Sequence, residues 1–282
     1  MNTAAAPADL KIIPRDVMFG RGKSNPRFWN GGDPVATTFY NALSLTFPQG
    51  ESYFVQSVRH YLDVLPEPLR TQVSEFAQQE AYHSREHMAF NRQVSSAGYQ
   101  VKEIDDLIRQ DIRGTKEEPP EVHLAGTAAL EHFTAMLAHA WLKDPRHFKD
   151  CPADVRRLWQ WHSIEEIEHK GVAFDTFLYV TRELSPFQRW LFRVMVMRSV
   201  TVGFWKERVR DLHILFKQDG LDTPKTWRRL VVYLLFKPGL LTQVLLPYLA
   251  YYRPGFHPWN HDDRKLAQKV EQSLRLDEAA RA

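Results

Sequence analysis

The stretch HSIEEIEH, residues 162–169, decides how the rest of the chain can be interpreted. Glu166 and His169 stand three residues apart, and residues with that spacing share one face of an α-helix. His162 lies one turn before Glu166 on the same face. The stretch therefore predicts a helix that presents one carboxylate between two imidazoles.

A matching segment, EAYH, occupies residues 80–83 and repeats the Glu-x-x-His spacing. In each half of the chain another glutamate comes first, on a separate predicted helix: Glu51 in the first half and Glu131 in the second. Four helices that supply Glu, Glu-x-x-His, Glu and Glu-x-x-His in this order carry the ligands of a carboxylate-bridged di-iron or di-manganese centre. The sequence therefore predicts a site for two iron ions, with manganese or zinc as alternatives.

These polar residues continue apolar stripes, which indicates that they face a core. The stripe through the EAYH segment consists of Leu69, Val73, Phe76, Glu80, His83, His87, Phe90 and Val94. Similar stripes run through Glu131 and through Glu166. Buried carboxylates without partners are costly, so several that converge on one core need a cation or one another.

We expect seven metal ligands, with the central pair of carboxylates, Glu80 and Glu166, bridging the two ions. The full set is Glu51, Glu80, His83, Glu131, His162, Glu166 and His169. His87 lies on the same stripe outside the usual ligand set, so it is an extra ligand, a group behind the ligands or a plain core histidine. The competing interpretation is that these residues are hydrogen-bonded core groups without a metal. Four neighbours fall off the stripes and are expected to be solvated or salt-bridged: Glu86, His132, Glu165 and Glu168.

The predicted fold is all-α. A ferritin-like four-helix bundle is expected at residues 35–182, after an irregular N-terminal segment, 1–34, and before C-terminal helices, 183–282, that pack on the bundle. Within the bundle we expect a first helix that begins near Val35 and is interrupted at 48–50, and further helices at about 68–95, 121–143 and 153–182, with a short helix or loop at 101–118. Pro48 and Gly50 predict that Glu51 opens a new helical segment or lies just past a kink.

The composition excludes several classes of protein. A net charge of +3 on 282 residues is too small to suggest nucleic-acid binding. The single cysteine, Cys151, excludes an intrachain disulfide and suits a reducing compartment. The start of the chain has no apolar run typical of a secretory signal, so a cytoplasmic protein is expected.

The C-terminal third is both apolar and basic. Its two apolar runs, 190–205 and 230–252, are interrupted by Arg193, Arg198 and Lys237, so a spanning helix is not expected. Packing of these helices on the bundle, where they can wall a substrate channel, is the favoured interpretation. Contact with a membrane surface is the alternative, and the oligomeric state is left open.

Three segments carry a resemblance to a known family: 47–51 (FPQGE), 80–87 and 161–169. With them the chain, from about Arg15 to Tyr252, resembles a bacterial family catalogued as predicted metal-dependent hydrolases. That resemblance implies metal binding. With His162 as a third histidine one turn before the last Glu-x-x-His, the ligand positions, though not the chain around them, resemble those of the di-iron arylamine N-oxygenases.

The first functional prediction is a non-haem di-iron oxygenase that uses O2 and an electron donor to N-oxygenate or hydroxylate a small aromatic or apolar molecule. The alternative is a metal-dependent hydrolase that uses a metal-bound hydroxide, as the family description implies. A further alternative is an iron-binding protein without catalysis. The extra apolar third of the chain fits a storage protein poorly.

Overall fold

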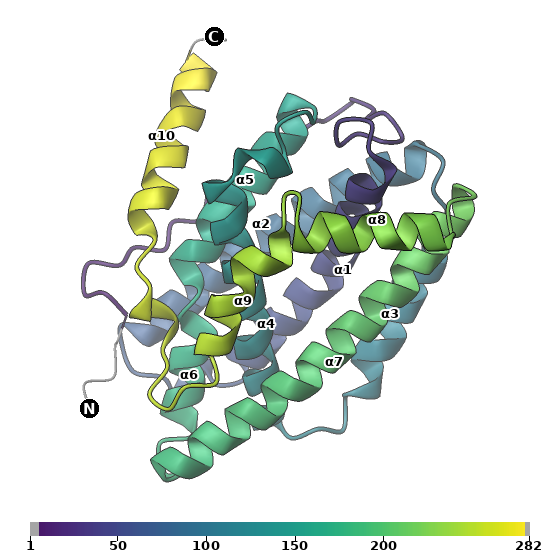
Figure 1. The fold of residues 1–282 in the computed structure, drawn as a ribbon. Coiled ribbons are helices and arrows are strands. Elements are labelled where there is room, and N and C mark those ends of the chain that lie inside the picture. The colour runs from purple at the N-terminus through teal and green to yellow at the C-terminus, as the bar shows by residue number, and fades with distance from the viewer. Residues whose placement is uncertain (1–5, 280–282) are drawn as a thin grey trace.

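The protein is all-α in the computed structural model, which describes residues 6–279 (Figure 1). The longer helices are α1 (Pro34–Arg59), α2 (Leu69–Ser96), α3 (Lys102–Gly114), α4 (Pro120–Lys143), α5 (Ala153–His169), α6 (Val172–Val180), α7 (Pro186–Gln218), α8 (Pro224–Leu235), α9 (Leu240–Ala250) and α10 (Arg264–Ala279). Short 3₁₀ turns are η1 (Leu62–Val64), η2 (Pro145–His147) and η3 (Pro258–Asn260). The described part of the N-terminal segment, residues 6–33, contains no helix.

Helix α1 runs through Pro48 without a break, so Glu51 lies inside a continuous helix and does not open a new one. A proline inside a helix removes the N–H that would bond to the carbonyl four residues earlier. That carbonyl belongs to Ser44, and Asn91 of α2 donates to it from Nδ2 at 3.0 Å. The neighbouring helix thus replaces the lost bond and allows α1 to continue.

The predicted helix at 153–182 is wrong in one respect, because it is divided into α5 and α6 at Lys170 and Gly171. The indole of Trp259 packs so closely here that a Cβ on Gly171 would lie 2.6 Å from its Nε1. Lys170 is buried and donates to the Asp263 carboxylate at 2.5 Å. Contacts with the distant C-terminal segment therefore accompany the break.

Four helices form the core of the molecule. Helix α1 packs on α2 and α4, and α5 packs on α4 and α2, so the four close a ring around a common interior. Helix α6 continues α5 against α2 and α4, while α10 packs outside α5 (Figure 1). This arrangement aims the inner stripes of four helices at one another.

Helices α7, α8 and α9 cover one side of this core (Figure 1). Helix α7 begins with a capping box between Ser185 and Gln188, and it packs on α1 and α4 through buried residues such as Met197 and Leu212. Among the described residues no single helix is long and apolar enough to cross a membrane. Helices α8 and α9 reach that length and composition only as a pair, and the pair is bent by 56°.

Candidate metal centre

The ring of four helices brings all seven predicted ligands together in its interior. Each has a side chain that is at most 2 % exposed. Glu51 comes from α1, the EAYH pair from α2, Glu131 from α4, and the remaining three residues from α5. The described structure therefore collects four carboxylates and three imidazoles in one buried cluster.

Glu166 lies at the centre of this cluster. Its Oε1 is 3.1 Å from Nε2 of His162 and 3.5 Å from Nδ1 of His83. Its Oε2 is 3.5 Å from Nε2 of His169. The two oxygens of one carboxylate thus face different imidazoles, as a carboxylate shared by two cations would require.

Glu80 occupies the corresponding position on α2. Its Oε1 is 3.1 Å from Nε2 of His169 and 3.7 Å from Nδ1 of His83. Glu80 joins Glu131 and His169 in one group of ligand atoms within 4.8 Å of each other, and joins Glu51 and His83 in another. The cluster therefore has two lobes that share Glu80 and Glu166.

Nine polar atoms of the cluster have no hydrogen-bond partner among the described residues. Within the described residues, no hydrogen bond with acceptable geometry reaches the inward atoms Glu51 Oε1, Glu80 Oε1 and Oε2, His83 Nδ1, Glu131 Oε1 and Oε2, His162 Nε2, Glu166 Oε2 and His169 Nε2. The short distances above are contacts between charged or polar groups that are not aligned as hydrogen bonds. Buried polar atoms are rarely left without a partner, so this inward-facing set of oxygens and nitrogens fits two cations.

Burial and mutual repulsion disfavour simultaneous ionisation of all four carboxylates in the cluster. Burial, together with the nearby Glu80, raises the pKa of Glu51 well above its ordinary value. Burial and Glu166 do the same to the pKa of Glu131. Burial also opposes ionisation of Glu166, but the imidazoles of His169 and His162 outweigh it and lower its pKa well below the usual range. Only part of the carboxylate set can therefore be ionised without added positive charge.

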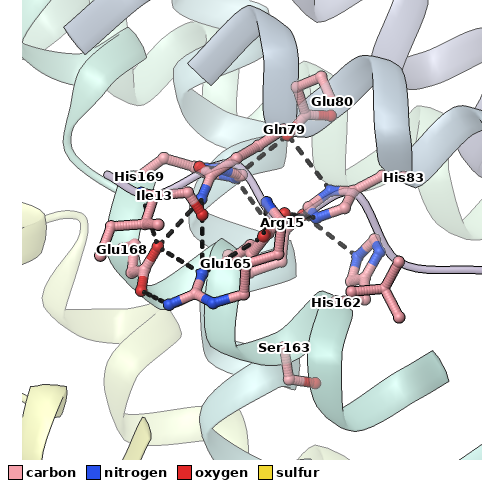
Figure 2. Close-up of polar contacts among 12 residues, drawn as sticks. Ile13, Arg15, Gln79, Glu80, His83, His162, Ser163, Glu165, Glu168 and His169 are labelled. Atoms are coloured by element: carbon pink, nitrogen blue, oxygen red, sulfur yellow. Dashed lines mark hydrogen bonds and ion pairs between the residues drawn. The ribbon is translucent and has the colours of Figure 1, made fainter. Parts of the chain in front are cut away.

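Each Glu-x-x-His histidine is supported by the residue that precedes the glutamate of the other motif (Figure 2). The Nε2 of His83 lies 3.1 Å from Oε2 of Glu165. The Nδ1 of His169 lies 2.8 Å from Oε1 of Gln79. These outer hydrogen bonds leave Nδ1 of His83 and Nε2 of His169 facing the cluster, so the two motifs orient each other crosswise.

His87 acts from behind the cluster. Its Nε2 lies 3.2 Å from Nδ1 of His162, and its own Nδ1 lies 2.8 Å from the Ser44 hydroxyl. Burial lowers the pKa of His87 well below its usual value, and burial beside His83 lowers the pKa of His162 to about 4. His87 also has a ligand atom within 4.8 Å of ligand atoms of Glu51 and His162. Both of its nitrogens already contact neighbouring side chains, which favours an orienting role over direct ligation.

Two of the four residues predicted to be solvated or salt-bridged are buried ion-paired carboxylates. Glu165 is fully buried, and it accepts from the backbone N–H of Arg15 at 2.9 Å and pairs with the Arg15 guanidinium at 3.3 Å. Glu86 is also buried and pairs with Arg21 and Arg85. Because Arg15 and Arg21 belong to the distant N-terminal segment, the sequence predicts the salt bridging of these carboxylates but not their burial.

The other two residues differ in environment. Glu168 is partly exposed and pairs with Arg15 at 2.6 Å (Figure 2). His132 is buried, contrary to the expectation of a solvated or salt-bridged group, and lies 3.1 Å from the Pro247 carbonyl of α9. The sequence could not reveal this contact because α9 is distant in the chain.

Sequence reasoning missed Gln79, Glu165 and Ser84 as supporting residues. Ser84 donates to Oε2 of Glu51 at 2.7 Å. A signal for the first two was present: Gln79 and Glu165 occupy the same place in the two motifs, directly before the glutamate. A repeated polar residue at equivalent positions indicates a shared role that a single stripe does not explain.

A pocket of about 310 Å³ leads to the cluster. Glu51, His162 and Glu166 contribute to its lining, and the rest of the wall is largely apolar. The apolar lining comes from α1, α3, α4 and α7 and includes Phe47, Phe54, Ile112, Leu130, Phe133 and Phe204. The pocket therefore offers an apolar molecule access to one side of the cluster.

A second group of ligand-type residues lies outside the bundle interior, at His139, His261 and Asp263. The Asp263 carboxylate is already paired with Lys170 at 2.5 Å. Burial lowers the pKa of Lys170, although the paired Asp263 carboxylate opposes that effect. An ammonium beside the carboxylate disfavours a cation there, so the bundle interior is the stronger candidate.

The outer hydrogen bonds give a first testable prediction. Replacing Glu165 by alanine should weaken metal binding about 10–100-fold, because His83 loses the group that fixes its ring. Titration with metal under competition from a chelator measures the affinity. Glu183→Ala, at an exposed surface ion pair, is the matched control and should bind like the parent protein. Equal affinities in both variants would show that Glu165 has no orienting role.

Comparison with known proteins adds a family but no close relative. Neither the curated proteins nor the solved structures include a significant match to this chain. The family match extends over residues 13–262 and so includes all seven residues of the cluster, the orienting residues and the pocket. The chain belongs to the family described as predicted metal-dependent hydrolases.

Proposed function

We propose that this protein is a metal-dependent enzyme with a two-metal centre inside its helical bundle. The observation that carries the proposal is the set of buried, unpartnered oxygens and nitrogens, all of which point inward from seven side chains. Glu80 and Glu166 would be shared between the ions, with Glu131 and His169 on one side. Glu51, His83 and His162 would complete the set on the other side.

The proposed reaction is hydrolysis of an ester or phosphoester bond in a small, largely apolar substrate. The sequence pattern by itself places oxidation first, whereas family membership supports the hydrolase alternative. Bound metal ions would polarise the substrate and activate a water molecule. The residues of the chain would hold the ions, seat the apolar part of the substrate in the pocket and direct its reacting group toward Glu51, His162 and Glu166.

Oxidation by O2 is a second candidate. It is favoured by the ligand set, in which four glutamates and three histidines all come from helices, and by the apolar pocket that reaches it. Bound iron would supply the oxygen chemistry, and the protein would supply geometry and exclusion of water. Whether the resident metal is iron, manganese or zinc decides between the reactions as much as the pocket does.

One experiment separates the two reactions. The protein is loaded with iron, manganese or zinc and assayed with nitrophenyl esters and phosphoesters in air and without oxygen, while O2 consumption is followed with a reductant and small aromatic amines. Hydrolysis that is independent of oxygen and lost in His169→Ala supports the first proposal. Oxygen consumption by the iron form, with no hydrolysis of any ester, would replace it with the second.

A pocket variant tests whether substrate reaches the cluster by the proposed route. Gly203 of α7 lines the pocket, and a Cβ at this position would meet only the Glu207 carboxylate, at 3.9 Å, so Gly203→Phe should fill the cavity. The catalytic efficiency, kcat/KM, should fall at least about tenfold, or ~1.4 kcal/mol, with metal content unchanged. The adjacent residue Val202 is 70 % exposed, so Val202→Phe is the matched control and should retain activity. Full activity in Gly203→Phe would place the substrate elsewhere.

A further inference from the structure

Helix α7 carries an exposed apolar stripe that no part of the described chain covers. Its apolar members recur at intervals of four or seven residues, which are close to one and two turns of the helix and place them on one face. The apolar members are Phe187, Leu191, Met195, Val202 and Val209, and exposed Arg198 and Lys206 lie among them. The opposite face of α7 packs on the bundle, so the C-terminal helices bury one face and expose another.

Helices α8 and α9 extend this surface. Their exposed apolar residues are Val231, Val232, Leu235 and Phe236 at the end of α8, and Leu245, Leu246 and Leu249 on α9. Helix α9 is tied to α7 by a 3.1 Å hydrogen bond between Tyr248 and Thr201, and to α8 by Thr242. Figure 1 shows the three helices on the same side of the bundle. We refer to these exposed residues together as the α7–α9 face.

The charge of this region is strongly positive. Residues 186–253 contain 12 lysines and arginines but four aspartates and glutamates, although the net charge of the whole chain is only +3. Lys225, Arg228 and Lys237 are exposed on or just after α8, and they flank its exposed apolar residues in the sequence. The four acidic residues, Glu207, Asp211, Asp219 and Asp222, are buried or partly buried, and Asp211 and Asp219 pair with Arg208 and Arg27. The exposed charge on the α7–α9 face is therefore basic.

The combination of exposed apolar residues and basic charge favours one kind of partner for the α7–α9 face over another. A two-fold contact with a second copy would bring the same basic residues face to face, and like charges in an interface are unfavourable. An anionic bilayer offers acyl chains for the apolar residues and negative headgroups for the basic ones. The bent pair α8 and α9 has the apolar composition of a membrane segment without a straight length to cross one.

We propose that the α7–α9 face docks on the surface of a bilayer that contains anionic lipids. The apolar side chains would enter the boundary between headgroups and acyl chains, with Lys225, Arg228 and Lys237 among the phosphates. The sequence favours packing of the C-terminal helices on the bundle over contact with a membrane. The exposed apolar residues reverse that preference, because the arginines interrupt the apolar runs but leave apolar side chains exposed on the outer face. Docking itself is independent of the reaction.

The docked face adjoins the substrate pocket. Val200 and Gly203 of α7 line the pocket, and Val202 between them points outward with an exposure of 70 %. One helix thus separates the bilayer from the pocket. An apolar molecule dissolved in the membrane would have a short path to the metal cluster, a consequence that rests on the proposed function.

Vesicle flotation of the full-length protein tests the proposal. Vesicles of phosphatidylcholine with about 30 % phosphatidylglycerol should carry the protein, and pure phosphatidylcholine vesicles should carry much less. Added salt should release it, because charges at the surface are screened within about 8 Å at physiological ionic strength. The assay is run on metal-loaded and on chelated protein, so that a failure of the proposed metal site can be distinguished from a failure of membrane docking.

Variants of exposed residues locate the contact without disturbing the core. Phe236 and Leu246 are 68 % and 75 % exposed, so the pair Phe236→Ser and Leu246→Ser should fold normally and bind at least about tenfold more weakly. Arg228→Glu should reduce binding to vesicles that contain phosphatidylglycerol and leave binding to pure phosphatidylcholine vesicles unchanged. Val64→Ser, at an apolar residue with 61 % exposure outside the α7–α9 face, is the matched control.

Two results would overturn the proposal. The first is failure of the parent protein to float with either kind of vesicle. The second is a dimer in solution that the Phe236→Ser and Leu246→Ser pair dissociates, with no vesicle binding, since the face would then join two copies of the chain.

Discussion

Replacing Glu166 by alanine is expected to reduce the metal content from about two ions per chain to less than one. The reason is geometric: Oε1 of Glu166 faces His83 and His162, while Oε2 faces His169. Removal of this one carboxylate therefore weakens both lobes of the cluster. Turnover should be lost with the metal, because no other described group in the pocket provides an equivalent centre.

Elemental analysis of the purified variants measures this effect. His83→Ala and His169→Ala should each lose about one ion, since each histidine contributes to a single lobe. Glu103→Ala, at an exposed position of α3, is the control and should keep the metal content of the parent. Full occupancy in both histidine variants would remove the basis for the proposed ligand set.

Chelation of the metal is expected to lower the melting temperature substantially. A ligand at about 1,000 times its Kd stabilises the folded state by about 4 kcal/mol. In a protein of this size, 1 kcal/mol corresponds to a shift of about 2–4 °C, so a decrease on the order of 10 °C is expected. Differential scanning calorimetry of metal-loaded and chelated protein measures it, and equal melting would indicate carboxylates paired among themselves.

The stability of the metal-free protein should also depend on pH through the buried carboxylates. Burial and Glu166 raise the pKa of Glu131 above its ordinary value of 4.5, so the folded state holds the proton more tightly than the unfolded state. This contribution to the free energy of unfolding is present below pH 4.5 and is lost as the pH rises toward the folded-state pKa. The difference in the free energy of unfolding between metal-loaded and chelated protein should therefore increase with rising pH. In Glu131→Gln this difference should be smaller than in the parent protein.

Helical periodicity explains why the cluster could be predicted from sequence. Ligands three or four residues apart share a face whatever the rest of the fold does, and apolar neighbours such as Val73 and Phe76 identify that face as the inner one. The all-α fold follows from the same stripes. Both properties are local, and both are found in the described structure.

Features that depend on packing could not be predicted in the same way. Asn91 compensates for Pro48 only because α2 lies against α1, and Trp259 reaches Gly171 from almost ninety positions further along the chain. The stripe of α5 assigns Glu165 no part in the site, because this residue falls off it. In the structure Glu165 turns toward α2, where His83 lies, and the crosswise support between the motifs requires the two helices to be neighbours.

The most direct test of the central claim is an anomalous difference map from crystals of the metal-loaded protein, collected at the absorption edge of the metal found by elemental analysis. Two peaks about 3.5–4 Å apart are expected in the bundle interior, with the carboxylates of Glu80 and Glu166 between them. An empty interior would rule out a two-metal centre at this position. Peaks confined to His139, His261 and Asp263 would rule it out equally, because they would place the metal outside the bundle.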